Sequence, residues 1–121
     1  MKKPTKTSMT NKLDKICSDL VRSRGICERC GPARYYEFSQ LQCAHIYSRT
    51  YRNTRWDLKN LLSLCASCHF WGHKNPIEFA DWVRDHIGQE NWQELRRRRN
   101  EIKRWTVNEM VEYYETLKGV R

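Results

Sequence analysis

The sequence predicts one domain of the α+β class, in which a small β-hairpin and a helix form a ββα core flanked by helices on both sides. Three observations indicate this architecture. Two Cys-x-x-Cys pairs enclose residues 31–64, short apolar segments lie within that interval, and helical periodicity with capping residues dominates the rest of the chain. A length of 121 residues favours a single domain.

The N-terminal region combines a basic start with an amphipathic segment. Residues 1–9 contain three lysines and no long apolar run, so we expect a disordered basic tail and not a secretory signal. A helix is predicted from about residue 10 to residue 24, and Gly25 ends it. Its apolar positions recur at helical spacing and are Leu13, Ile16, Cys17, Leu20 and Val21. The domain proper is expected to span residues 10–121.

The core of this domain is expected at residues 26–75. It begins with the first Cys-x-x-Cys turn. The segments that follow are a loop with a short strand at 32–39, a strand at 41–46, a polar arginine-rich loop at 47–56, a second strand near 61–64 and a helix to about residue 74. Two short apolar segments joined by a polar loop are typical of a hairpin. The second Cys-x-x-Cys pair then lies where the second strand passes into the helix.

Residues 76–121 are predicted to form a helical extension. Asn75, Pro76 and Glu78 fit the cap, the first and the third position of a helix that Gly88 ends. A second helix is expected at about 89–103, with Trp92, Leu95 and Ile102 on its apolar face. The last helix begins at a capping box formed by Thr106 and Glu109.

Four cysteines have the spacing of a zinc site. Zn²⁺ prefers thiolate ligands in a tetrahedron, and each Cys-x-x-Cys turn supplies two sulfurs from one knuckle. Four protein ligands leave no open position, so this zinc is expected to be structural. A disulfide framework is the alternative, and the absence of a secretory signal disfavours it. The predicted ligands are Cys27, Cys30, Cys65 and Cys68.

The charge of the chain indicates a polyanionic partner. The formal net charge is +9, which favours nucleic acid. A membrane surface is the competing partner, but no long apolar run or lipidation signal is present. The residues expected to contact DNA phosphates are Arg49, Arg52 and Arg55 in the loop, and Arg97 and Arg98 in the run at 96–99. The alternative for both groups is a solvated surface.

The ordered motifs resemble those of a known nuclease family. The order is Cys-x-x-Cys, Cys43-Ala44-His45-Ile46, Asp57-Leu58-Lys59-Asn60, and Cys65-x-x-Cys-His with a second histidine four residues on. This pattern resembles the HNH endonucleases of the ββα-metal class, in a phage type that carries a four-cysteine structural zinc and is similar to NinG/Rap-like phage nucleases. The resemblance covers roughly residues 26–75 and does not extend to the flanking helices.

This resemblance implies a metal-dependent DNA endonuclease. His45 would be the general base, and the carbonyl of Asn60 would hold its other ring nitrogen. His69 and His73, four residues apart on a helix, would bind a catalytic Mg²⁺, Mn²⁺, Ni²⁺ or Zn²⁺, with Asp57 as a third ligand. Hydrolysis would leave 5′-phosphate and 3′-hydroxyl ends. A phage nuclease would act in the host cytoplasm, as a monomer or dimer, with DNA packaging or recombination machinery as possible partners.

One residue departs from the family pattern. Many HNH nucleases have a metal-binding Asp or His directly before the base, where this chain has Ala44. Asp57 would replace that ligand, or the two histidines would suffice with water and DNA phosphate, or the site would be inactive. Cys43 shares the strand face of His45 and is expected to be a packed thiol, with metal binding as its alternative. A catalytically silent, zinc-stabilised DNA-binding module is therefore the rival function, and a zinc-ribbon protein-interaction domain is a third.

Overall fold

The computed structural model describes residues 2–120, which form a mixed helix and sheet structure. Its α-helices are α1 (Lys6–Arg22), α2 (Arg52–Arg55), α3 (Ala66–Lys74), α4 (Pro76–Ile87), α5 (Gln89–Asn100) and α6 (Val107–Lys118). The strands β1 (Leu41–His45) and β2 (Leu61–Cys65) are preceded by the short 3₁₀ turns η1 (Phe38–Gln40) and η2 (Leu58–Asn60). The predicted order of elements, a two-stranded hairpin with helices before and after it, is confirmed.

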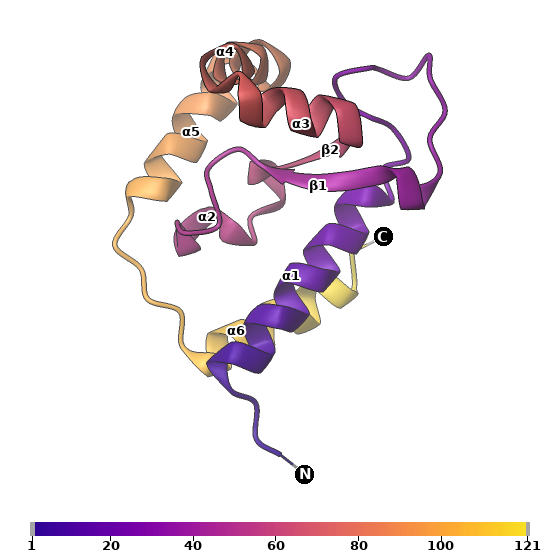
Figure 1. Ribbon diagram of the computed structural model, residues 1–121. Coiled ribbons are helices and arrows are strands. Elements are labelled where there is room, and N and C mark those ends of the chain that lie inside the picture. The colour runs from indigo at the N-terminus through magenta and orange to yellow at the C-terminus, as the bar shows by residue number, and fades with distance from the viewer. Residues whose placement is uncertain (1, 121) are drawn as a thin grey trace.

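The hairpin lies between two groups of helices (Figure 1). α3 and α4 pack on one side of it, and α1 with α6 lies on the other. α5 leads away from α4 along the edge of the domain, and residues 101–106 then connect it to α6. The first and the last helix therefore end up side by side although they are far apart in the sequence.

The two strands pair antiparallel over their full lengths. The register runs from Leu41 opposite Cys65 to His45 opposite Leu61. Successive side chains of a strand point to opposite faces, so Ala44 and His45 face different sides of the hairpin. Ala44 is buried in the apolar cluster of the α3 and α4 side, whereas Leu61, the partner of His45, belongs to the cluster on the α1 side.

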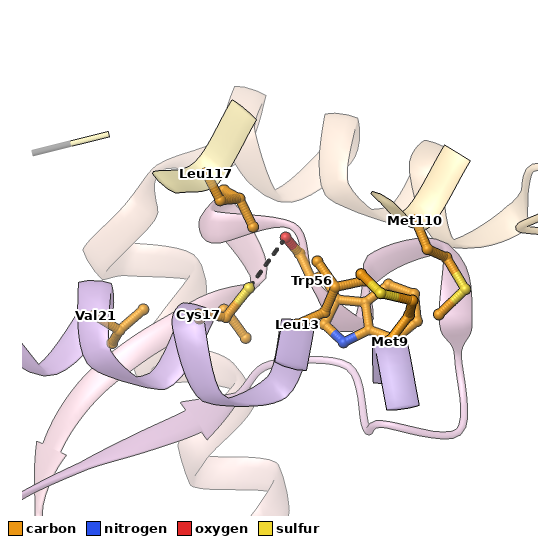
Figure 2. Close-up of a cluster of buried hydrophobic side chains, with 8 residues drawn as sticks. Met9, Leu13, Cys17, Val21, Trp56, Met110 and Leu117 are labelled. Atoms are coloured by element: carbon orange, nitrogen blue, oxygen red, sulfur yellow. Dashed lines mark hydrogen bonds between the residues drawn. The ribbon is translucent and has the colours of Figure 1, made fainter. Parts of the chain in front are cut away.

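The core on the α1 side is built around Trp56. Its side chain is fully buried, and its indole N–H donates to the carboxylate of Asp14 at 2.8 Å. Figure 2 shows the thiol of Cys17 directed at the Trp56 carbonyl oxygen, 3.7 Å away. α1 and α6 run in the same direction against this residue. The buried members of the cluster are Met9, Leu13, Cys17, Val21, Trp56, Leu61, Met110 and Leu117.

The second core joins the hairpin to α3 and α4. Leu62, Leu64 and Val83 are buried there together with three of the four paired cysteines. α3 and α4 approach closely because Gly72 has no side chain, since a Cβ at this position would lie 2.7 Å from the Phe79 ring. The hairpin is thus covered on this side by a two-helix layer that begins directly after β2.

The N-terminal helix begins earlier than the sequence indicated. α1 starts at Lys6, and Met9 is already buried in the core, so residues 6–9 do not belong to a disordered tail. The reason is a reciprocal cap. The Thr5 hydroxyl accepts from the Ser8 N–H, and the Ser8 hydroxyl accepts from the Thr5 N–H. Met1, the first residue of the expected tail, lies outside the described residues.

Three further expectations are corrected within the described residues. Residues 32–39 contain no strand, and the arginine-rich loop includes the short helix α2. The helix expected at 89–103 ends at Asn100, where the Asn53 side chain donates to the carbonyl oxygens of Arg98 and Arg99. Ile102 is consequently fully exposed and contributes nothing to a core. Asn53 is far from the end of α5 in the sequence, and helical periodicity does not reveal a partner at such a distance.

No helix within residues 2–120 has both the length and the apolar character needed to cross a membrane.

Truncating Leu13 tests the packing of α1 against Trp56 and α6. We expect Leu13→Ala to lower the free energy of unfolding by about 2–5 kcal/mol, because it leaves a cavity in a fully buried site. Asn11→Ala, on the exposed face of the same helix, should change it by less than about 0.5 kcal/mol. Urea unfolding of the metal-loaded protein measures both. Equal effects would contradict the described core.

Candidate functional site

The four paired cysteines form one cluster. The sulfur atoms of Cys27, Cys30, Cys65 and Cys68 all lie within 4.8 Å of one another, and this group is positioned to bind a metal ion. The Sγ of Cys30 is 3.6 Å from that of Cys68 and 4.0 Å from that of Cys65. In a tetrahedron with Zn–S bonds of 2.3 Å, the sulfurs are about 3.8 Å apart. The geometry therefore fits the predicted structural zinc.

Local backbone geometry brings these sulfurs together. Gly31 has a φ of +82°, which glycine adopts without strain, and its N–H donates to the Cys27 carbonyl at 2.8 Å to close the first knuckle. Cys65 and Cys68 lie at the N-terminus of α3, whose dipole favours thiolates. Burial acts to raise the pKa of Cys65, but hydrogen bonds from the Cys68 N–H and from Tyr36 outweigh it and lower that pKa to about 6.

Two side chains outside the cluster contact its sulfurs. The guanidinium of Arg29 donates to the Sγ of Cys68 at 3.5 Å while stacking 3.6 Å from the centre of the Trp71 ring. The Tyr36 hydroxyl lies 3.3 Å from the Sγ of Cys30. Such contacts partly neutralise a four-thiolate site, which carries an excess of negative charge. Neither contact was predicted from the sequence, where the only available signal was the position of Arg29 inside the Cys-x-x-Cys turn.

His45 lies at the end of β1 with one ring nitrogen held in place. Its Nε2 is 3.2 Å from the carbonyl oxygen of Arg55. A carbonyl only accepts hydrogen bonds, so Nε2 carries the proton and Nδ1 keeps its lone pair. Burial, together with the positive charge of Arg49, lowers the pKa of His45 below 6.5. The residue is thus neutral at pH 7 and able to accept a proton.

Asn60 does not contact His45 as expected. Its side chain is fully buried, and its Oδ1 accepts from the Tyr47 N–H at 2.8 Å. Its Nδ2 donates to the carbonyl oxygens of Tyr47 and Thr54, both at 3.0 Å. These three bonds fasten both ends of the loop between the strands. Asn60 thereby fixes the segment that presents the Arg55 carbonyl to His45, and its effect on the histidine is indirect.

His69 and His73 form a pair on α3. Their Nε2 atoms are 3.2 Å apart. The Nδ1 of His69 is 2.6 Å from the Oε1 of Gln42, so Nδ1 donates and the lone pair of His69 lies on Nε2, toward His73. Two nitrogens at this separation, each about 2.1 Å from one ion, would subtend about 100° there, which suits a divalent metal. Gln42 is a site residue that the motif analysis missed.

The other residues considered as catalytic metal ligands are not part of this pair. The Asp57 carboxylate binds Arg98 at 2.7 Å through Oδ2 and accepts from the Lys59 N–H at 3.0 Å through Oδ1. Ala44 is buried on the face of the hairpin toward α3. Cys43 is half-buried, and burial raises the pKa of its thiol to about 11, which agrees with a packed thiol. The structure does not bring Asp57 to the histidine pair.

A cavity of about 740 Å³ connects the three histidines. His45, His69 and His73 all line it, at the junction of β1, α3, α4 and α5. Arg49 lies in its wall as well. A smaller hollow of about 370 Å³ on the α1 side also reaches His45 and Arg49. The three histidines that the motif suggested therefore border one surface depression, and His45 also borders the hollow on the α1 side.

Most of the arginines expected to contact DNA have partners within the protein. Arg55 makes a two-point contact with the carboxylate of Asp14, at 3.0 and 2.7 Å. Arg52 donates to the Thr10 hydroxyl at 3.0 Å. Arg49, by contrast, is exposed, and its guanidinium has no hydrogen-bond or ion-pair partner among residues 2–120. It is the loop arginine that is free to bind a phosphate.

Most of the arginines of the run on α5 also have partners within the protein. Arg97 pairs with Glu94 and Glu101, and Arg98 pairs with Asp57. Arg99 stacks 4.8 Å from the ring centre of Tyr47 in the loop between the strands. This run therefore attaches α5 to that loop.

No protein-family model matches the chain, and comparisons with curated proteins and with solved structures find no match either.

Metal analysis tests the four-cysteine site. We expect the purified protein to contain one zinc ion per chain and Cys68→Ser to lose it, with a large drop in melting temperature, because metal binding contributes to folding. Cys43→Ser replaces a cysteine outside the cluster and should retain the zinc. Mass spectrometric metal quantification and thermal unfolding provide the readouts. Zinc-free wild-type protein, or equal loss in both variants, would exclude the assignment.

Proposed function

We propose that this protein is a metal-dependent DNA endonuclease of the HNH type. One observation carries the proposal. The Nε2 atoms of His69 and His73 are 3.2 Å apart, with His69 oriented by Gln42, and both histidines line the cavity that His45 lines. A hairpin followed directly by this helix supports the same family. The net charge of +9 favours a nucleic-acid substrate.

The proposed mechanism assigns a separate task to each residue. Nδ1 of His45 accepts the proton of the attacking water, while the Arg55 carbonyl keeps Nε2 protonated and the ring oriented. His69 and His73 would hold a divalent ion, which would supply Lewis-acid stabilisation of the scissile phosphate and of the 3′ oxygen. Arg49 binds a phosphate oxygen beside the base. Phosphodiester hydrolysis then yields a 5′-phosphate and a 3′-hydroxyl.

Two protein ligands are enough in this proposal because the remaining positions belong to water and DNA. Imidazole nitrogens suit Ni²⁺ or Zn²⁺ better than Mg²⁺, and water and phosphate oxygens would complete the coordination of such an ion. The engagement of Asp57 with Arg98 removes the carboxylate that the sequence suggested. Metal affinity in the absence of DNA is therefore expected to be weak.

The second candidate is a zinc-stabilised DNA-binding module without catalytic activity. Ala44 favours it, because a buried methyl group occupies the position where many related nucleases carry a metal ligand. This candidate retains the roles of the four cysteines and of Arg49 but not those of the histidines. It differs from the nuclease only in cleavage.

Plasmid cleavage separates the two candidates. We expect the wild-type protein to nick supercoiled DNA with Mg²⁺, Mn²⁺ or Ni²⁺, and His45→Ala to be about 10²–10⁴-fold slower, as for loss of a general base. His73→Ala should lose the metal response. His86→Gln is the matched control, since His86 lies on α4, pairs with Glu28 and does not line the cavity. DNA retention without cleavage under any metal would favour the silent module.

The pH dependence of cleavage tests the environment of His45. Only neutral His45 accepts a proton, and its lowered pKa places the acidic loss of activity below pH 6.5. Removing the nearby charge in Arg49→Gln should raise that pKa and move the acidic limb to higher pH. Rates at saturating metal and DNA, measured from pH 5 to 8, report the position of the limb.

Arg96→Gln is the control for this shift. Arg96 is exposed on α5 and does not line the cavity. Its substitution therefore removes the same charge at a position outside the cavity. An equal shift in both variants, or none in Arg49→Gln, would show that His45 does not set the acidic limb.

A further inference from the structure

The 740 Å³ cavity has two chemically different parts. Its polar side carries the three histidines, Arg49 and Ser48. The remaining wall is apolar, and it is formed by Ile46, Pro76, Phe79, Ala80, Val83 and Trp92. Val83 and Ala44 are almost completely buried and nevertheless line the cavity, so it extends from the surface to the interior. The proposed phosphate chemistry uses only the polar side.

The aromatic residues of the apolar wall are held in place by their neighbours. The Phe79 ring lies against α3 in the space that Gly72 leaves, with the Trp82 ring centre 6.0 Å away. Trp92 has the Tyr47 ring at 6.4 Å and the guanidinium of Arg84 5.0 Å from its own ring centre. Rings supported in this way form a pocket before any ligand arrives, which lowers the entropic cost of binding.

The group that fills this pocket must have particular properties. It must be covalently close to a phosphate, because the polar side binds one in the proposed function. It must also be uncharged, because burying an ion against apolar walls is costly. A nucleobase meets both conditions, and its flat faces stack well on aromatic side chains. A base in a regular duplex is already stacked and paired, so only an unpaired base is available.

We propose that the apolar part of the cavity binds the base of an unpaired nucleotide next to the scissile phosphate. This inference rests on the proposed nuclease function and specifies its substrate as DNA that contains an unpaired nucleotide. Unstacking and unpairing a base costs a few kcal/mol in a matched duplex and least where the base is already unpaired. Regular duplex is therefore a poor substrate.

Binding of a bulged base tests the pocket without requiring cleavage. Three fluorescent duplexes of the same sequence are compared in EDTA at a concentration that leaves the zinc in place: fully paired, with one bulged adenosine, and with one bulged abasic nucleotide. The abasic bulge has the same backbone distortion but no base. We expect the adenosine bulge to bind about 5- to 150-fold more tightly than the abasic bulge, the factor expected for stacking of one base.

Two variants locate this preference in the cavity. Ala80→Leu fills the pocket from α4, and Trp92→Leu removes an aromatic wall while retaining an apolar side chain. Each folded variant, verified by its melting temperature, should bind both bulges equally. Phe70→Ala removes an aromatic ring that is 64% exposed on α3 and does not line the cavity, so it should keep the preference.

The outcomes distinguish this inference from the nuclease proposal. Equal binding of the two bulges by the wild-type protein, or an undiminished preference in both cavity variants, overturns the base pocket even if plasmid is cleaved. A preference for the bulged base that both cavity variants lose supports the pocket even if no metal produces cleavage. If the adenosine-bulged duplex also stays uncut with Mg²⁺, Mn²⁺ and Ni²⁺, the nuclease proposal fails and the pocket belongs to a binding module.

Discussion

The four-cysteine cluster is the constraint on which the arrangement of the site depends. A two-stranded hairpin with strands of five residues is marginal in water by itself. The cluster links the turn before β1 to the first turn of α3 and so encloses the hairpin between two fixed points. The contact between Gln42 on β1 and His69 on α3 depends on that link. A structural metal would thus determine the distance between groups to which the proposed function assigns the chemistry.

A second, metal-free support acts on the opposite end of the hairpin. Asp14 on α1 accepts from both Trp56 and Arg55, and Asn60 holds the loop from inside. Although burial opposes it, these hydrogen bonds, the one from Arg55 foremost, lower the pKa of Asp14. The carboxylate is therefore charged at neutral pH. The carbonyl that orients His45 belongs to Arg55, so the proposed base is coupled to α1, outside the ββα segment itself.

Local patterns allowed much of this structure to be predicted from the sequence. The cysteine spacing gave the cluster, and the Thr106 capping box gave the start of α6. Partners far apart in sequence were not predictable. Asp57 was considered as a metal ligand, but Arg98 occupies its carboxylate, and Asn60 was assigned to His45 although it binds the backbone. Polar side chains have many possible partners, and only the tertiary structure selects among them. Gln42 carries no motif signal because its role depends on the register of the strands.

The parallel packing of α1 and α6 has a consequence for the synthesis of the chain. The ribosome synthesises α1 before residues 107–118, so the apolar stripe of α1 has no partner while the intervening residues are made. Such long-range pairing slows folding. It also means that a nascent chain which already contains every cysteine and histidine of the site still exposes Met9, Leu13 and Val21 to chaperones and proteases. Synthesis of α6, more than assembly of the metal centre, would then decide when this core is closed.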